Sequence, residues 1–431
     1  MANAFAARHV SGTQPGAISG ARAWWSVFIF TIALMFNFLD RQLMTLLITP
    51  IKQDLGLSDT QIGFIVGPAF SITYALAAIP IARLSDRYRR KYVIGIAISV
   101  WSLFTAAGGT AQNFLTLLLA RTGLAVGEAA LTPAAHSMIS DTFPGKTRAR
   151  AIAIYSTGIT LGIFLALALG GYINDRYGWR AAMYLVGASG LFMTVVIVLT
   201  VKEPARGAPK PETGTRPRKE TIRSMFADPV IRHTIIGGTL LCASHGTMAW
   251  IPAYMIRNFS LSSSEVGASF GIAGLLSGLL GVLAGGFIND WLAKRNIRWP
   301  FRFFAVAFAA GALLKIAALL VPGFFGFLVL ICLSSMLLVA YPGPTYGMLQ
   351  SRVDSDSRSF ASAVGLFCFQ GIGISIGSFL AGWLSDNLPA SDGATSLRWA
   401  LVIVSMFSVW SGFHYYWATR HLGKARSGPP Q

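Results

Sequence analysis

The run WWSVFIFTIALMFNFLDRQLMTLLIT, residues 24–49, is long enough to cross a membrane as one helix. A helix needs roughly twenty apolar residues to span a hydrocarbon core of about 30 Å. Similar runs recur along the 431 residues, of which 54% are hydrophobic and 12% charged, with a mean hydropathy of +0.57. Soluble domains carry about 25% charged residues, and the alternating segments typical of a membrane barrel are absent. The sequence therefore predicts an all-α membrane protein.

The apolar runs predict twelve transmembrane helices in two pseudo-symmetric six-helix bundles, residues 24–201 and 231–420, between tails at 1–23 and 421–431. The segment 202–230 is rich in Pro, Lys, Arg and Glu, and it is expected to be a linker because it cannot bury a core. The expected spans are 24–49, 59–82, 92–111, 113–140, 148–174, 179–201, 231–257, 265–290, 301–320, 323–350, 359–385 and 397–419.

The distribution of basic residues predicts how the chain is oriented. Most Lys and Arg lie in the two tails and in the even-numbered loops, and such residues stay on the cytoplasmic side. Both termini and the linker are therefore expected to be cytoplasmic, in a multi-pass protein of the inner (plasma) membrane. The same bias accounts for the net charge of +18 without a nucleic-acid partner.

Nothing in the sequence predicts a cofactor or an enzyme. Cys242, Cys332 and Cys368 lie within apolar runs, where small core residues are expected rather than a disulfide or a metal site. No phosphate-binding loop and no His and Cys cluster with metal-ligand spacing is present, so neither ATP nor a metal is expected.

Four helix ends repeat one pattern. Span 2 ends at Ser85-Asp86 and span 8 at Asn289-Asp290, while span 5 ends at Asn174-Asp175 and span 11 at Ser385-Asp386. An Asp-terminated helix thus recurs every third span, and the second half nearly repeats the first. Nested three-helix repeats are typical of transporters, which build inward- and outward-facing states from one set of parts.

Several motifs resemble the major facilitator superfamily. ARLSDRYRRK at 82–91 is similar to its cytoplasmic motif after span 2, with Ala82 and Arg89 where glycine is usual. Within the superfamily the chain resembles the Spinster group, through NFLDR at 37–41, DRYRRKY at 86–92, RTGLAVGEA at 121–129 and EPARG at 203–207. This resemblance implies twelve helices, alternating access, and lipid-like substrates such as sphingosine-1-phosphate or lysophospholipids.

Four ionisable residues lie inside the apolar runs of the first half: Asp40 and Arg41 in span 1, and Arg121 and Glu128 in span 4. A charge at bilayer depth is unfavourable unless it is paired or faces water, so such residues mark a functional site. Arg121 and Glu128 share one helix face, whereas Asp40 and Arg41 point about 100° apart. We expect one network of two acids and two bases that lines a water-filled cavity between the halves.

This network predicts proton coupling. A buried carboxylate that loses its cationic partner binds a proton more readily, and regaining the partner releases the proton. Asp40 and Glu128 are the expected proton carriers, and Arg41 and Arg121, with Glu128, are expected at the substrate. The alternative is a static network that only fixes helix packing.

The second half carries almost no buried charge. His245 in span 7 and Gln370 in span 11 are its candidates for the substrate site, although a single His among apolar residues is more often packed in the core. Lys315, near the end of span 9, is expected to extend its amine to the membrane surface. Charge in one half and an apolar wall in the other suit an amphipathic substrate.

The family pattern further implies that Asp86, Arg87 and Arg90 form a cytoplasmic gate that latches the halves in the outward-open state. The function expected is that of a monomeric secondary transporter, coupled to protons, for an amphipathic lipid-like or organic anionic substrate. The alternatives are a proton-linked sugar-acid or carboxylate symporter, because an Asp-Arg pair in span 1 also resembles organic-anion symporters, and a membrane lipid sensor that transports nothing.

Overall fold

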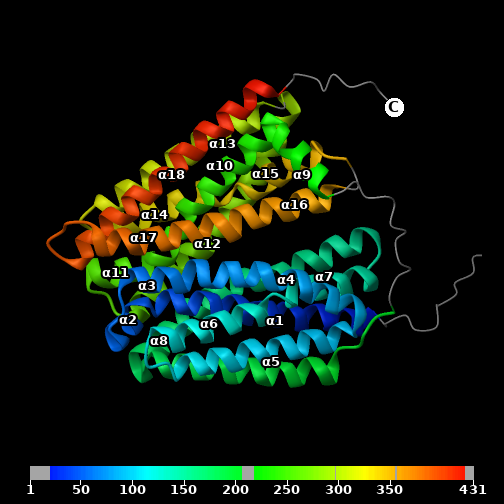
Figure 1. Cartoon of the computed structure of the whole chain (residues 1–431), viewed down its shortest axis with the longest axis horizontal. Coiled ribbons are helices and arrows are strands. Elements are labelled where there is room, and N and C mark those ends of the chain that lie inside the picture. The colour runs from blue at the N-terminus through cyan, green and yellow to red at the C-terminus, as the bar shows by residue number, and fades with distance from the viewer. Residues whose placement is uncertain (1–19, 206–217, 297, 355–356, 423–431) are drawn as a thin grey trace, which may run out of the picture.

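The computed structural model describes residues 20–205, 218–296, 298–354 and 357–422. Across these ranges the chain forms helices and loops without a strand, as expected for an all-α protein. The helices lie in two groups (Figure 1). The first group comprises α1 to α8 and the second comprises α9 to α18.

The first group contains the following elements: α1 Gly20–Leu46, α2 Ile48–Leu55, α3 Asp59–Phe64, the π-helical η1 Ile65–Ala69, α4 Phe70–Arg87, α5 Arg90–Gly109, α6 Phe114–Glu128, α7 Leu131–Thr142 and α8 Gly145–Thr200. The second group contains α9 Arg218–Ala227, α10 Pro229–Gly246, the 3-10 turn η2 Thr247–Trp250, α11 Ile251–Phe259, α12 Ser263–Arg295, α13 Trp299–Leu320, α14 Phe324–Val339, α15 Pro342–Ser351, α16 Arg358–Leu366, the π-helical η4 Phe367–Ile374, α17 Ser375–Asn387 and α18 Gly393–His421.

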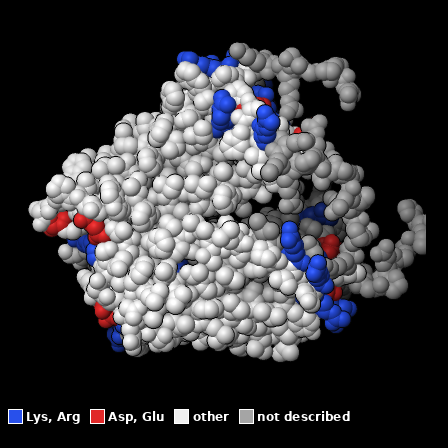
Figure 2. All heavy atoms as spheres, in the orientation of Figure 1, with Lys and Arg blue, Asp and Glu red and all other residues white. Residues whose placement is uncertain are grey.

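Much of this structure is long and apolar enough to cross a membrane. Nine helical stretches of the described chain meet that requirement, and one of them, Thr147–Thr200, has 54 residues. Within it Gly178 has φ of 83° and ψ of 164°, so α8 is two helices joined at this glycine. Charged side chains gather at the ends of the molecule, and the band between them is nearly uncharged (Figure 2). The chain is therefore a multi-pass membrane protein.

Several expected spans consist of two or three helical pieces. The span expected at 231–257 is α10, η2 and α11, and the span expected at 359–385 is α16, η4 and α17. Pro68 lies inside η1, where it lacks the N–H that a regular helix needs, and Pro252 is the second residue of α11, in its first turn after η2. Such interruptions often occur at functional sites.

The two groups pack tightly at one end, which we call the closed end because α2, α3 and α11 meet there. Glycines allow the backbones to touch: a Cβ on Gly63 would lie 2.8 Å from the Ser378 carbonyl oxygen, and one on Gly267 would lie 2.0 Å from that of Leu167. A hydrophobic core that includes Leu43, Ile62 and Trp250 continues across this contact. Towards the other end the groups diverge (Figure 1), and a hollow opens between them (Figure 2).

The segment expected as a linker has structure of its own. Within 202–230 the helix α9 packs beside α10, and the Met225 side chain is 1% exposed in the core of the second group. Glu203 accepts hydrogen bonds from Arg90 Nε and from the Lys91 amide.

Candidate functional site

The buried charges of the first group meet between α1 and α6. Arg41 Nε donates to Glu128 Oε2 over 2.5 Å, and the Glu128 side chain is fully enclosed while that of Arg41 is 26% exposed. Glu128 is the last residue of α6, and the helix then breaks at Ala129 and Ala130 before α7 begins. An ion pair with one enclosed partner is strongly coupled, because removing the cation leaves an uncompensated charge.

Aromatic rings hold both guanidinium groups of the site. The Arg41 guanidinium lies 4.8 Å from the centre of the Phe70 ring and 4.7 Å from that of Tyr74. The Arg121 guanidinium lies 4.7 Å from the same Phe70 ring. A cation over an aromatic face is stabilised by the ring quadrupole, and the effect grows when water is excluded. The ring of Phe70, the first residue of α4, thus lies beside both cations of the expected network.

Asp40 contacts a third helix. Its side chain is 4% exposed, and its Oδ2 is hydrogen-bonded to the Thr105 hydroxyl of α5. The same hydroxyl oxygen lies 2.9 Å from the Trp101 carbonyl oxygen, in the preceding turn. A hydroxyl has only one hydrogen to donate. The Thr105 hydroxyl thus serves two acceptors with one hydrogen, the Asp40 carboxyl and the Trp101 carbonyl, and this links Asp40 to α5.

Arg121 is 7% exposed, and its Nε has no hydrogen-bond partner within the described part of the chain. A guanidinium offers five donors in a planar fork, which matches the geometry of carboxylates and phosphates. Arg121 can therefore bind an anionic group without breaking an existing hydrogen bond at this nitrogen.

His245 and Gln370, the candidates from the second half, lie in the second group. His245 is half-buried at the end of α10, and Gln370 is exposed in η4. No hydrogen bond or ion pair of the described chain joins either residue to Asp40, Arg41 or Glu128.

The expectation for Lys315 is wrong. Its side chain is 0% exposed, and Nζ donates to the Ser244 carbonyl oxygen over 3.1 Å and to the Thr247 hydroxyl. Lys315 faces the break between α10 and η2 instead of the membrane surface. Because α13 is apolar on all sides, its sequence does not reveal which face points inward.

The residues expected as a cytoplasmic gate are arranged within the first group. Arg90 is 3% exposed and is hydrogen-bonded to Asp141 of α7, to Ser137 and to Glu203. Arg87 is exposed at the end of α4. The side chain of Asp86 lies outside the described residues, so its expected role in the gate stays a prediction.

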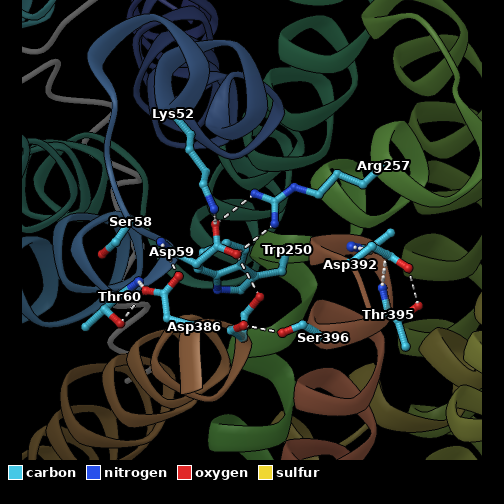
Figure 3. A network of polar contacts seen from close by, with 12 residues as sticks. Lys52, Ser58, Asp59, Thr60, Trp250, Arg257, Asp386, Asp392, Thr395 and Ser396 are labelled. Atoms are coloured by element: carbon cyan, nitrogen blue, oxygen red, sulfur yellow. Dashed lines mark hydrogen bonds and ion pairs between the residues drawn. The ribbon is translucent and has the colours of Figure 1, made fainter. Parts of the chain in front are cut away.

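The closed end holds a second charged cluster, which the sequence analysis missed (Figure 3). Asp59 opens α3, and its side chain is 2% exposed. It accepts hydrogen bonds from Lys52 over 2.7 Å, from the two Arg257 Nη atoms over 2.7 and 2.8 Å, and from Ser385 over 2.7 Å. Since Arg257 and Ser385 belong to the second group, this cluster joins the two groups.

Two aspartates from the repeated helix ends reinforce this contact in a symmetric way. Asp386 of the second group accepts hydrogen bonds from the Asp59 and Thr60 amides at the start of α3 (Figure 3). Asp175 of the first group accepts them from the Ser263 and Ser264 amides at the start of α12. Each half thus caps a helix of the other, where a carboxylate is favoured by free N–H groups and the helix dipole. The repeat read from the sequence is therefore also a repeat of contacts.

The described chain forms two groups of membrane helices with repeated helix ends and a buried charge cluster in the first group. The two groups are in contact at one end and leave a hollow at the other. This is the architecture of a transporter. The chain belongs to the Major Facilitator Superfamily, whose model matches residues 30–378. It is 31% identical to an MFS-type efflux pump of Mycolicibacterium smegmatis, over 92% of both chains. It is 27% identical to a hexuronate transporter of Bacillus subtilis, over 89% of this chain and 92% of that one.

Among solved structures, the chain is similar to a bacterial homolog of the human lysosomal transporter Spinster, in an inward-facing and unoccupied conformation. The TM-score is 0.85 at 27% sequence identity, covering 96% of this chain and 100% of that one. The resemblance to the superfamily and to its Spinster group is confirmed, and the protein is a transporter.

Proposed function

We propose that this protein is a proton-coupled secondary transporter for an amphipathic, lipid-like or organic anion. The observation that carries the proposal is the buried cluster in which Glu128 pairs with Arg41, Asp40 contacts Thr105, and Arg121 keeps a free donor. It combines two acids that can exchange protons with a cation that can take an anion.

The proton steps follow from the pairing. Asp40, enclosed beside the Thr105 hydroxyl that donates to it, would carry one proton through the cycle. An anionic substrate that draws Arg41 away from Glu128 leaves the Glu128 carboxylate enclosed without its cation, so Glu128 takes up a proton. Return of Arg41 after substrate release expels that proton. Substrate and proton then move in a fixed order.

The substrate proposal follows from the contrast between the halves. Arg41 and Arg121 would bind the anionic head, while the facing spans of the second half offer an apolar surface to a chain. Phe367, 50% exposed at the start of η4, would belong to this surface. His245 and Gln370 would contact the substrate after the halves close around it.

For alternating access we propose twelve crossings in two bundles, 24–201 and 231–420, joined through 202–230, with both termini cytoplasmic in the inner membrane and a monomer as the working unit. The closed end then faces outward, and the hollow opens to the cytoplasm. The inward-facing conformation of the similar Spinster homolog supports this orientation. Asp59 and its partners would form the outer gate, and Asp86, Arg87 and Arg90 the inner one.

A sugar-acid or carboxylate symporter is the second candidate, favoured by the similarity to a hexuronate transporter. In that case Arg41 and Arg121 would bind the carboxylate, and the apolar wall would stay empty.

A binding screen separates the two candidates. The purified protein is tested with lysophospholipids, single-chain lipid phosphates and sugar acids by thermal shift, and again as Glu128→Gln. We expect stabilisation by the single-chain lipids, with altered affinity in the variant. Stabilisation by sugar acids alone would overturn the lipid proposal, and binding without any uptake into proteoliposomes would indicate a sensor.

A further inference from the structure

Lys315 is a buried amine for which the proposed transport cycle has no use. It lies on α13, five residues before the helix ends at Leu320, and is 0% exposed. Burying an amine at this depth costs free energy unless polar partners compensate for the lost water, and such residues usually have a function.

The partners of Lys315 match an uncharged amine. Nζ donates one hydrogen bond to the Ser244 carbonyl oxygen and one to the Thr247 hydroxyl, and that hydroxyl donates to the Ser244 oxygen over 2.7 Å. These contacts form a closed ring. A neutral amine has two hydrogens to donate, and both are used. The third hydrogen of an ammonium group finds no further acceptor among the residues that the structure describes.

The surroundings also offer no opposite charge. His245 of α10 is the titratable group that interacts with Lys315. The Tyr254 hydroxyl of α11 donates to the Leu319 carbonyl oxygen one turn further along α13, and α14 carries no charged residue. The charged residues of the two other helices packed on α13 lie near the helix ends. On α12 they are Glu265, Asp290, Lys294 and Arg295, and on α18 they are Arg398 and Arg420. The other titratable side chains of α18 are those of His414, Tyr415, Tyr416 and His421. No described carboxylate forms an ion pair with Lys315. Burial without a counter-charge favours the uncharged form of an amine.

The ring around Lys315 is tied to the contact between the halves. Ser378 of α17 donates to the Gly246 carbonyl oxygen over 3.0 Å and accepts from Trp250 Nε1 over 3.0 Å. The Ser378 carbonyl oxygen is also the atom that Gly63 of α3 approaches. In addition, η2 contacts α1, the helix that carries Asp40 and Arg41. A change at Lys315 therefore acts on the segment where the second half contacts two helices of the first.

We propose that Lys315 is a second proton-binding site, in the half of the transporter whose acids lie only near helix ends, and that it is uncharged while the closed end is closed and takes a proton when that end opens. Opening separates α11 and α17 from the first half and lets water reach the break between α10 and η2. Water then supplies the acceptor for the third hydrogen, and the amine becomes an ammonium ion by taking one proton from the external solution. Closure expels the water and returns the proton. This proposal rests on the proposed alternating access and not on Asp40 or Glu128 as carriers.

The test is performed in a background where both acids of the first half are neutral. Spin labels on α2 and α11 report opening of the closed end as a function of pH, in Asp40→Asn/Glu128→Gln and in the same protein with Lys315→Met. We expect the double variant to keep a residual pH step in which opening increases as the pH falls, by up to about tenfold per pH unit, the limit for one proton. Lys315→Met should remove the step.

Two further variants complete the experiment. Lys315→Gln can donate to both acceptors, the Ser244 carbonyl and the Thr247 hydroxyl, but it cannot be charged. It should therefore keep the ring of hydrogen bonds and still remove the pH step. This variant tests the proposal if the Met variant does not fold. Lys294→Met, an exposed lysine of α12, is the matched control and should keep it. A double variant without a residual step, or a step that survives the Lys315 substitutions, would overturn the proposal. If the acids are not the carriers, the double variant behaves like the unmodified protein, which is a distinguishable result.

Discussion

Substituting Asp59→Asn tests the closed end of the transporter most sharply. Asp59 is the only carboxylate in the described chain that accepts hydrogen bonds from Lys52, Arg257 and Ser385 together, and the last two lie across the contact between the halves. Asn keeps the shape and one acceptor oxygen, but it removes the charge. Because the bonds to Arg257 exist only while this end is closed, their loss should shift the protein towards the open conformation.

The magnitude follows from burial. Breaking a buried ion pair costs about 3–5 kcal/mol, and exposed pairs contribute at most about 1 kcal/mol. The Asp59 side chain is 2% exposed, that of Arg257 13% and that of Lys52 30%. Because the two cations are partly exposed, we expect a free-energy cost at the lower end of the range for buried ion pairs. A loss of about 3 kcal/mol of stabilisation of the closed conformation raises the ratio of open to closed protein by about 100-fold, since about 1.4 kcal/mol corresponds to a factor of ten.

The assay is the distance between spin labels on α2 and α11, with Asp54→Asn as the matched control. Asp54 lies in the same region, but it pairs with Arg180 of its own half, and both side chains are well exposed, at 44% and 38%. The hydrogen bond from Arg180 lowers the pKa of Asp54, so Asp54 is ionised at neutral pH. The pair does not depend on opening, because both residues belong to the first half. The control should leave the distances unchanged. An Asp59→Asn protein that shows the unmodified distance distribution would refute the reasoning.

Three more predictions concern the buried charge cluster and the closed end. Arg121→Lys should weaken binding of the anionic substrate by about tenfold with little change in thermal stability, measured by titration calorimetry, because Lys lacks the planar fork that stacks on Phe70; unchanged affinity would place the anion elsewhere. Asp175→Ala and Asp386→Ala should each favour the open conformation by about 1 kcal/mol, the typical effect of losing a helix cap, and strongly unequal shifts in the label distances would contradict the symmetry. Gly267→Val should block closure and uptake, because its Cβ would lie 2.0 Å from the Leu167 oxygen, whereas Gly274→Val, which meets nothing within 4 Å, should transport normally in vesicles.

The sequence predicts the class of fold well because each crossing is a long apolar run whose length is set by the bilayer. It also singles out Asp40, Arg41, Arg121 and Glu128, since charge inside such a run is conspicuous. Which of them pair could not be predicted: Asp40 and Arg41 are neighbours, yet one contacts α5 and the other α6. That choice depends on how the helices are rotated against one another.

Other features carry no signal in the chain itself. Asp59 follows Ser58 at the start of a helix, where an acidic residue is ordinary, and only the fold places Arg257 beside it. Thr105 and Phe70 are unremarkable members of apolar helices. The position of Lys315 near a helix end predicts an amine at the membrane surface, whereas the fold turns it towards the break between α10 and η2. The repeated Asn174-Asp175 and Ser385-Asp386 ends were visible, but their function as caps of the opposite half needed the structure.

Proton coupling through the buried acids is the central claim, and it is tested most directly by comparing two transport modes in proteoliposomes. Gradient-driven accumulation of substrate is measured with an imposed pH difference, and substrate exchange is measured without one, for the unmodified protein, Asp40→Asn and Glu128→Gln. The account predicts that each variant loses accumulation driven by the pH difference. It further predicts that Asp40→Asn keeps exchange, because Asn leaves the Arg41–Glu128 pair in place. Accumulation that keeps its full dependence on the pH difference in both variants would contradict it.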